Sequence, residues 1–275
     1  MIFVTVALLI LVMLAVIYVF LVMPRAVDSA DMDLQSTDYA LRGLHSSRVP
    51  ENSLSAFALA KDSGYGIALD LRLSSDGYIF VFRDEDLFRL CGVNKRFCEL
   101  SAAEIRALRI SNTGEKIPLL SEVLALVDGQ VPLLIEIKSS PDAPKLCKKL
   151  AEILDTYSGA FALQSFEPRV LEFFKKYRPR FARGQMVTRA SAKKPNPNVP
   201  KNPFARFARF HLLTNIISRP DFISIDGNYI HEPAFLLATR VFRSKGFVFT
   251  VKTEKQYSIC RKNSLYAIFE NIKPI

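Results

Sequence analysis

The chain has 275 residues and carries 37 Lys and Arg against 27 Asp and Glu, so its net charge at neutral pH is +10. A chain of this length can form one large domain, and α/β barrels commonly reach this size. The four cysteines form no Cys-x-x-Cys pair and have no nearby His at metal-ligand spacing, which indicates free thiols in a reducing compartment. No nucleic-acid-binding motif is present, so the basic excess favours an anionic membrane surface or a generally soluble surface.

The chain begins with an apolar run, Ile2 to Met23, that contains no charged residue. At about 1.5 Å per residue, a helix of this length crosses the hydrocarbon core of a bilayer. A cleaved signal peptide is the alternative, but it normally has a basic start and a shorter apolar stretch. We expect residues 1–23 to be a retained single-pass anchor and residues 24–37 to be a polar tether. Basic residues follow the span, beginning with Arg25, and none precedes it, so the positive-inside rule favours a cytoplasmic C-terminal domain.

In residues 38–275, apolar runs of strand length alternate with amphipathic helical stretches. This alternation is typical of βα units around a parallel sheet, and we predict an α/β fold of the TIM-type (β/α)8 barrel class. Nine strand candidates are present for eight barrel strands, so one is a hairpin, an edge piece or not a strand. The candidates are Tyr39–Arg42, Ile67–Leu73, Tyr78–Phe82, Val131–Lys138, Phe161–Ser165, Arg183–Val187, Phe222–Ile225, Phe247–Val251 and Tyr266–Phe269. Helices are predicted at Asn52–Lys61, Ala143–Tyr157, Pro168–Tyr177, Pro233–Ser244 and Glu254–Lys262.

Residues 191–211 form a basic segment whose first half is rich in proline and asparagine. This composition predicts an extended loop over Lys193–Pro203. Phe204, Phe207 and Phe210 then recur at every third residue, with arginines between them. We expect the three rings to face the core, because apolar stripes on helices are usually buried. A helix lying among lipid head groups is the alternative.

Charged residues stand where several predicted strands end, which is where parallel barrels hold their working residues. Within the run VPLLIEIK, strand alternation places Glu136 and Lys138 on the same face. Both side chains need partners, because burying an unpaired charge in an apolar strand is costly. The pattern predicts a polar site at the barrel mouth, built from Arg42, Asp70, Arg83, Asp84, Glu136 and Lys138.

The motifs of the N-terminal third occur in a recognisable order. They are Leu41-Arg42-Gly43, Pro50-Glu51-Asn52, Ala68-Leu69-Asp70, Asp76-Gly77 and Arg83-Asp84. This order resembles the glycerophosphodiester phosphodiesterase family, in which the motifs read His-Arg-Gly, Pro-Glu-Asn, Glu-x-Asp, Asp-Gly and His-Asp. The resemblance covers nearly all of residues 38–270. It implies a (β/α) barrel that cleaves glycerophosphodiesters to glycerol-3-phosphate and an alcohol.

Three positions depart from the family pattern. Leu41 stands at the first catalytic His, Ala68 at a metal-binding Glu, and Arg83 at the second His. By resemblance, Asp70 and Glu136 are the remaining ligands of a divalent metal, Ca²⁺ or Mg²⁺. Leu41 cannot transfer a proton, and an arginine stays protonated at any usable pH. Ca²⁺ prefers six to eight oxygen ligands, so two carboxylates make a weak site.

We therefore hypothesise a pocket without a cofactor that binds phosphate through Arg42, Lys138 and Arg83. In this hypothesis the Arg83 guanidinium stands where the metal would stand and pairs with both carboxylates. The alternative is that Arg83 points to solvent. His45 lies four residues after Leu41, near the rim of the predicted mouth, and is therefore a candidate to replace a catalytic His.

Further residues are expected around this pocket. Glu51 and Gln164 are candidates to line it. Residues 84–116 are longer than a normal connection between strand and helix, and by resemblance they cover the pocket. Their alternative interpretation is an ordinary long loop that contains a short helix.

The sequence leaves three functions open. The first is a membrane-anchored family member of phospholipid metabolism that is catalytically impaired and binds phosphate-containing, lipid-derived ligands. The second is a divergent metal-dependent phosphodiesterase. The third is a non-catalytic scaffold at the membrane. The expected partners are a phospholipid membrane and a glycerophosphodiester-like ligand, with no nucleic acid, and the oligomeric state stays open.

Overall fold

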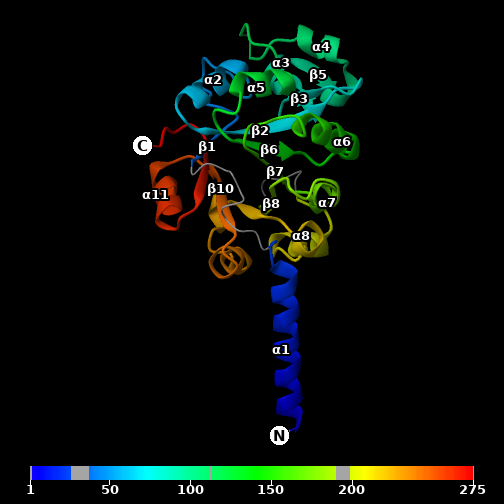
Figure 1. Cartoon of the computed structure of the whole chain (residues 1–275), viewed down its shortest axis with the longest axis vertical. Helices are drawn as coiled ribbons and strands as arrows, with labels where there is room; N and C mark the ends of the chain where they lie inside the picture. The colour runs from blue at the N-terminus through cyan, green and yellow to red at the C-terminus, as the bar shows by residue number, and fades with distance from the viewer. Residues whose placement is uncertain (1, 26–36, 112, 190–198, 275) are drawn as a thin grey trace.

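Eight parallel strands form a closed ring, because β1 pairs with both β2 and β11. The computed structural model describes residues 2–25, 37–111, 113–189 and 199–274. This ring, with helices packed around it, is the predicted TIM-type barrel (Figure 1). Its strands are β1 (Tyr39–Leu41), β2 (Gly66–Leu73), β6 (Leu133–Ile137), β7 (Phe161–Ser165), β8 (Arg183–Val187), β9 (Phe222–Asp226), β10 (Lys245–Val251) and β11 (Tyr266–Phe269).

The ninth predicted strand lies outside the ring. It is β3 (Ile79–Val81), which pairs antiparallel with β2 as the second strand of a hairpin. The hairpin turn uses Gly77 at φ +88°, a backbone conformation that glycine adopts without strain. The Ser74 hydroxyl accepts a hydrogen bond from the Tyr78 backbone N–H at 2.8 Å and closes the turn. The surplus strand candidate is therefore a hairpin strand.

The helices cover the outer face of the ring. Helix α2 begins at Leu54 instead of Asn52, because Ser53 caps it and Asn52 has a left-handed φ of 55°. The other helices on this face are α5 (Leu120–Val127), α6 (Ala143–Leu154), α7 (Pro168–Tyr177), α8 (Pro203–Phe210), α9 (Asn215–Ser218), α10 (Pro233–Leu236) with η3 (Leu237–Val241), and α11 (Glu254–Lys262); α2 ends at Asp62. The short turn η2 (Gly227–Tyr229) follows β9.

Two apolar layers hold the barrel together. The larger one lies between the strands and the helices and includes Leu69, Ile135 and Leu163. The smaller one fills the ring and includes Ala68 and Leu134. Because side chains alternate along a strand, the residues next to the buried Leu69 and Ile135 point inward. This alternation brings Asp70 and Glu136 to the inside of the ring.

Residues 84–116, apart from residue 112, which lies outside the described residues, form a small subdomain. It contains β4 (Asp86–Leu87), α3 (Phe88–Cys91), β5 (Val93–Arg96), η1 (Phe97–Glu99) and α4 (Ala102–Ala107). Its apolar cluster includes Phe80, Phe82 and Phe97, so it packs on the hairpin strand β3. In Figure 1 it occupies the end of the molecule farthest from α1. The segment is therefore a packed unit with its own core and not an open loop.

Helix α1 (Ile2–Val22) projects from the barrel, and its last turn is fixed on it (Figure 1). It is the one helix in the described part of the chain that is long and apolar enough to cross a membrane, although a signal sequence has the same properties. Asn215 Nδ2 donates to the Val22 carbonyl at 2.7 Å, and Arg219 Nη1 donates to the Met23 carbonyl at 2.9 Å. These bonds satisfy carbonyls that a helix end leaves without partners.

The predicted tether, residues 24–37, does not begin directly after the helix. The Arg25 guanidinium lies 2.5 Å from the buried Asp221 carboxylate, and its backbone N–H donates to the Pro220 carbonyl at 2.9 Å. Residues 26–36 lie outside the described residues. The first two residues of the predicted tether are thus part of the packed body.

The prediction that the three rings of α8 face the core is wrong for two of them. Phe210 is 8% exposed, whereas Phe204 is 77% and Phe207 is 55% exposed. Each step of three residues turns about 300° around a helix, so the three rings spread over about 120° of its circumference. Only the C-terminal turn of α8 packs on the body. The loop predicted from residue 193 lies outside the described residues up to residue 198.

Candidate functional site

Four of the six predicted mouth residues meet on or just after β1, β2 and β6: Arg42, Asp70, Glu136 and Lys138. Asp70 of β2 is paired in register with Glu136 of β6, and Glu136 is paired with Gln164 of β7. Three polar side chains therefore occupy one level of the barrel interior, on neighbouring strands. Gln164 accepts a hydrogen bond from the Ser224 hydroxyl at 2.7 Å, which connects this level to β9.

Arg42 is held in the centre of this region by a strained turn. Its φ of 59° is left-handed, and its backbone N–H donates to the Ala68 carbonyl at 2.6 Å. The guanidinium lies 3.5 Å from Asp70, 3.3 Å from Glu51 and 3.4 Å from Glu270. Three carboxylates thus surround a cation that is only 9% exposed.

Lys138 pairs with both carboxylates of the barrel interior. Its Nζ lies 2.7 Å from Asp70 Oδ1 and also donates to Glu136 Oε1. Burial acts to raise the pKa of Asp70, but Lys138 and Arg42 outweigh it and hold that pKa far below its ordinary value. For Glu136, burial outweighs Lys138 and the pKa is raised. The cation between Asp70 and Glu136 is therefore Lys138 and not Arg83.

Arg83 lies at the edge of the site, as the alternative interpretation of the sequence had it. Its side chain is 45% exposed, and its nearest ion-pair partner is Asp84 at 4.0 Å. The reason is topological, because Arg83 follows the hairpin strand β3, which lies outside the ring. Leu41 and Ala68, at the other two departures from the family pattern, pack in the apolar interior of the ring.

Glu51 connects the mouth to the small subdomain. It receives two hydrogen bonds from Arg89 of α3, at 2.6 and 3.0 Å, and Arg89 also bonds Asp84 at 2.5 Å. Burial acts to raise the pKa of Glu51, but Arg89 and Arg42 lower it below its ordinary value. No local sequence pattern points to Arg89, because its partner Glu51 lies 38 residues earlier in the chain.

Glu270 is a second site residue that sequence reasoning missed. It directly follows β11, is 8% exposed, and lies 3.4 Å from His45 Nε2 and 2.6 Å from Lys252 Nζ. His45, Lys252 and Arg42 together lower the pKa of Glu270 to about 2. The rule that identified Asp70, a charge at the end of an apolar strand, would also have identified Glu270.

The low pKa of Glu270 predicts how stability depends on pH. Its folded pKa of about 2 is below its ordinary 4.5, so its ionised form stabilises the fold above pH 4.5, and this contribution is lost as the pH falls toward 2. We expect Glu270→Gln to be less stable than the wild type at pH 7 and to lose less stability between pH 5 and pH 3. Thermal unfolding across this range tests the expectation, with the exposed Glu152→Gln as control. Parallel curves for Glu270→Gln and the wild type would contradict it.

A cavity of about 250 Å³ lies beside Lys138, between the barrel and the small subdomain. Arg72 and Lys138 line it from the barrel, and Arg96 lines it from the subdomain. Glu85 and Asp142 also line it, so the lining is basic by one charge. An anion of small size is therefore the ligand that its electrostatics favour.

The donor set at Asp70 and Glu136 does not fit a divalent metal. Within the described residues, no group of three or more His, Cys, Asp or Glu side chains could hold a metal ion. Two carboxylates face each other here, and cations already pair with them: Lys138 contacts both, and Arg42 contacts Asp70. A hard cation needs more oxygen ligands and uncompensated negative charge.

Comparisons with known proteins agree with this architecture. The family model described as "Glycerophosphoryl diester phosphodiesterase family" matches residues 42–271. A glycerophosphodiester phosphodiesterase of Caldanaerobacter subterraneus is 33% identical over 135 residues, which are 46% of this chain and 53% of the relative. The chain is thus matched over little more than half the length of its curated relatives.

Two solved structures share the fold. The glycerophosphodiester phosphodiesterase of Thermotoga maritima superimposes with a TM-score of 0.67 at 24% identity, over 85% of this chain and 94% of that chain. A phosphodiesterase of Oleispira antarctica, in complex with its product sn-glycerol-3-phosphate, superimposes with a TM-score of 0.69 at 21% identity, over 85% and 92% of the two chains.

Proposed function

Because the chain belongs to the glycerophosphoryl diester phosphodiesterase family, we propose that it is a membrane-anchored member that binds phosphate-containing, lipid-derived ligands and is impaired in hydrolysis. The contact of Lys138 with both Asp70 and Glu136 carries the proposal. The ion pairs of the mouth contain as many cations as carboxylates, so no net negative charge is left to attract a dication. The cations are Lys138, Arg42, Arg89 and Lys252, and the carboxylates are Asp70, Glu136, Glu51 and Glu270. Ala68 is the position at which a third carboxylate would restore that charge.

Besides a metal site, the mouth lacks a group that could transfer a proton. Hydrolysis of a phosphodiester needs a group that titrates near neutral pH within hydrogen-bond reach of the reacting oxygens. Leu41 has no such group, and a guanidinium at Arg83 does not release its proton. His45 lies against Glu270, whose carboxylate also contacts Arg42 and Lys252. This environment supports a structural role for His45 and not a role as catalytic base.

Cations at the mouth support binding of a phosphate group. Lys138 has three N–H donors, and Asp70 and Glu136 take two of them, so one is left for a ligand. Arg83 is exposed beside the mouth, with its guanidinium 4.0 Å from Asp84. We assign these two residues to phosphate recognition, together with Arg42 at the centre of the mouth. Glycerol-3-phosphate, the product named for the Oleispira relative, is the first ligand to test.

Helix α1 supports the membrane part of the proposal. Its 21 residues carry no charge and suit a single span, and Arg25 follows it on the side of the body. The positive-inside rule favours a cytoplasmic barrel for such a span.

Calorimetric titration of the full chain in detergent micelles tests the ligand. We expect no binding heat with Ca²⁺ or Mg²⁺ and measurable binding of glycerol-3-phosphate in the absence of metal. Arg83→Ala should weaken that binding by about 10-fold to 100-fold, the value of one lost charge-assisted hydrogen bond. The exposed Lys262→Ala, on α11, is the matched control. Metal binding together with metal-dependent release of glycerol-3-phosphate from a glycerophosphodiester would instead support the divergent phosphodiesterase. Absence of binding for every ligand tested would support the scaffold.

A further inference from the structure

The end of α1 leaves no spacer between a membrane and the body. Its 21 residues span about 31 Å, which is close to the thickness of the hydrocarbon core. Val22, the last residue of the helix, is completely buried in the body. Arg219 adds to this attachment, since its guanidinium lies 4.7 Å above the ring of Phe20. If the whole helix crosses a bilayer, the adjoining surface of the body lies at the level of the head groups.

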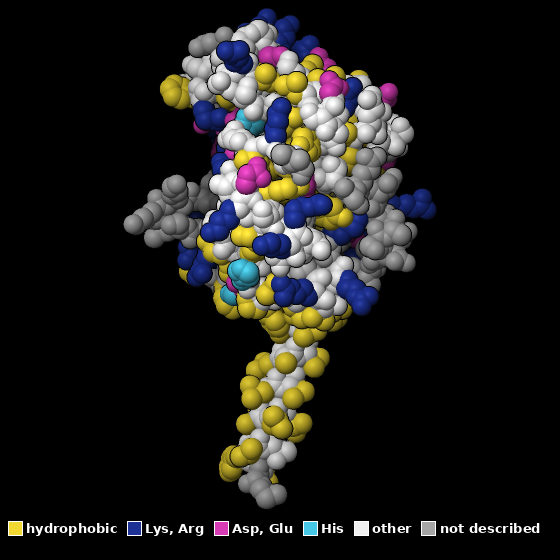
Figure 2. Space-filling model, turned by 90° about the vertical axis from the view of Figure 1, so that its left-hand side faces the viewer, with side chains coloured by type: hydrophobic (Ala, Val, Ile, Leu, Met, Phe, Trp, Pro, Cys, Tyr) yellow, Lys and Arg dark blue, Asp and Glu magenta, His cyan; other side chains and the backbone are white. Residues whose placement is uncertain are grey.

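That surface exposes apolar side chains around the point where α1 emerges. We call it the α1 edge and define it by α8, α9 and η3, which lie along the lower border of the body in Figure 1. Figure 2 shows apolar side chains gathered along this border, where the stalk joins the body. The exposed apolar residues of the α1 edge are Phe204 (77%), Phe207 (55%), Ile216 (39%), Ile217 (36%) and Val241 (64%).

Basic side chains accompany these apolar residues. In the sequence, the exposed Arg206 stands between the two exposed rings of α8, and Arg240 and Arg243 stand within two residues of Val241. In Figure 2, lysines and arginines lie directly above the apolar border. A single exposed apolar residue needs no explanation, but a contiguous group with a basic margin indicates an interaction surface.

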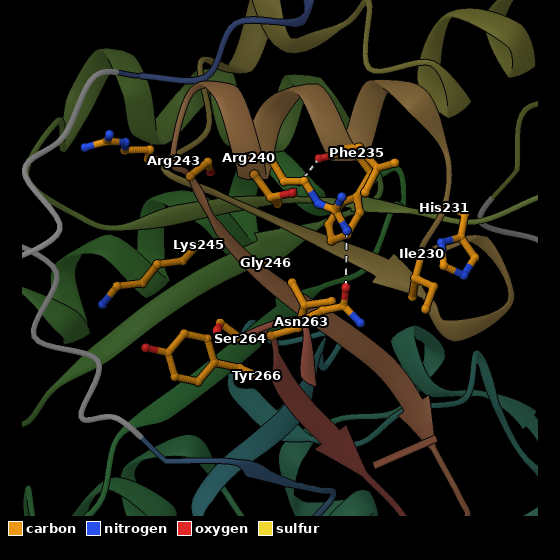
Figure 3. A pocket seen from close by; sticks show the side chains of 14 residues that line it. Ile230, His231, Phe235, Arg240, Arg243, Lys245, Gly246, Asn263, Ser264 and Tyr266 are labelled. Carbon is orange, nitrogen blue, oxygen red and sulfur yellow. Dashed lines mark hydrogen bonds between the residues drawn. The ribbon is translucent and has the colours of Figure 1, made fainter. Parts of the chain in front are cut away.

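The basic side chains at η3 surround a cavity of about 270 Å³ (Figure 3). Arg240 Nη2 donates to Asn263 Oδ1 at 3.2 Å, which holds its guanidinium across the opening. Arg243 and Lys245 extend to the same side in Figure 3, and Lys245 Nζ lies 5.9 Å from the centre of the Tyr266 ring. The lining contains cations, hydroxyl groups and one amide but no carboxylate, so an anionic group such as a lipid phosphate fits its charge.

We propose that the α1 edge is a second membrane contact, at which Phe204, Phe207 and Val241 enter the bilayer interface and Arg240 and Arg243 bind anionic head groups. The inference rests on the proposed function in one respect, namely that α1 is a retained anchor. A bilayer is favoured over a protein partner because the edge surrounds the exit of α1, so the membrane that α1 crosses meets it first. Aromatic and basic side chains are also those that favour the lipid interface.

Single-tryptophan fluorescence tests this contact, since the chain contains no Trp. The full chain carrying Phe207→Trp is reconstituted into phosphatidylcholine vesicles with and without phosphatidylglycerol. In both kinds of vesicle the phosphatidylcholine has brominated acyl chains, which quench nearby tryptophan. Phe88→Trp, at a 66% exposed ring in the distant subdomain, is the matched control, and Leu11→Trp reports on α1. We expect Leu11→Trp and Phe207→Trp to lose most of their emission and Phe88→Trp to keep it.

The other outcomes separate this inference from the anchor. Quenching of Leu11→Trp alone would overturn the α1 edge as a membrane contact and leave the anchor intact. Absence of quenching at both positions would overturn the anchor and the contact together. A blue-shifted but unquenched Phe207→Trp would mean burial against protein, such as a second copy of this chain, and would also overturn the contact.

The role of charge has its own test. In the Phe207→Trp background, Arg240→Gln with Arg243→Gln should reduce quenching in vesicles that contain phosphatidylglycerol and leave it unchanged in pure phosphatidylcholine. Equal quenching of the two proteins in both kinds of vesicle would overturn the assignment of Arg240 and Arg243 to anionic head groups.

Discussion

Replacing Lys138 by methionine is expected to lower the free energy of unfolding by about 3–5 kcal/mol, the typical cost of removing one partner from a buried ion pair. The side chain of Lys138 is 12% exposed and contacts both Asp70 and Glu136, which are themselves buried. Without the ammonium, two carboxylates face each other with only Arg42 to compensate them. For a barrel of this size, the change corresponds to a fall in Tm of about 6–20 °C. Thermal and urea unfolding of the full chain in micelles measure both quantities.

Lys252→Met is the matched control for this experiment. Lys252 also bonds a buried carboxylate, at 2.6 Å from Glu270, but its side chain is 55% exposed. Its loss should cost no more than about 1 kcal/mol, as for other exposed ion pairs. Adding Asp70→Asn and Glu136→Gln to Lys138→Met should recover most of the lost stability, because the two carboxylates that lost their partner are then neutral. Equal losses for Lys138→Met and Lys252→Met would contradict the arrangement described above.

The second large effect is a gain of activity. Combining Leu41→His, Ala68→Glu and Arg83→His restores the three residues that the family pattern assigns to proton transfer and metal binding. We expect release of glycerol-3-phosphate from a glycerophosphodiester to rise by at least about 100-fold, the lower end of what acid–base catalysis contributes. The release should also require Ca²⁺ or Mg²⁺, because a third carboxylate leaves the site with one uncompensated negative charge.

Two variants control this result. Leu41→His with Arg83→His, without the third carboxylate, should show no dependence on metal. Asp70→Asn in the triple variant should remove the gained activity. Because Ala68 is 1% exposed inside the ring, the folding of each variant is checked by its Tm, and Ala68→Asp provides a smaller carboxylate. A folded triple variant without metal-dependent turnover would contradict the view that these three positions account for the impairment.

Much of the fold follows from local patterns in the sequence. Apolar runs and their spacing predicted the strands, and strand alternation correctly put Glu136 and Lys138 on one face, since both point into the ring. The sequence does not show which of the nine candidates lies outside the ring. That depends on which strands pair with each other, and among the described strands β3 pairs only with the end of β2. This pairing also decides the place of Arg83, since a residue that follows an edge strand lies beside the mouth and not within it.

The parts of the site that the sequence did not predict depend on contacts between distant segments. Arg89 reaches Glu51 only because the small subdomain folds over the mouth, and Glu270 meets Arg42 only because the last strand pairs with the first. The exposure of Phe204 and Phe207 has the same origin. Whether an apolar stripe is buried depends on what packs against the helix, and no property of α8 itself contains that information.

If α1 is the membrane anchor proposed above, its fixed end also couples the barrel to the thickness of the membrane. A span that is longer than the local hydrocarbon core tilts to fit it. Since Asn215, Arg219 and the Asp221–Arg25 pair hold the last turn of α1 on the body, the barrel tilts with the helix. The small subdomain is the part of the body farthest from α1, so tilting changes its height above the lipid surface most. Bilayers of different thickness would therefore hold the mouth of one protein at different distances from their lipids.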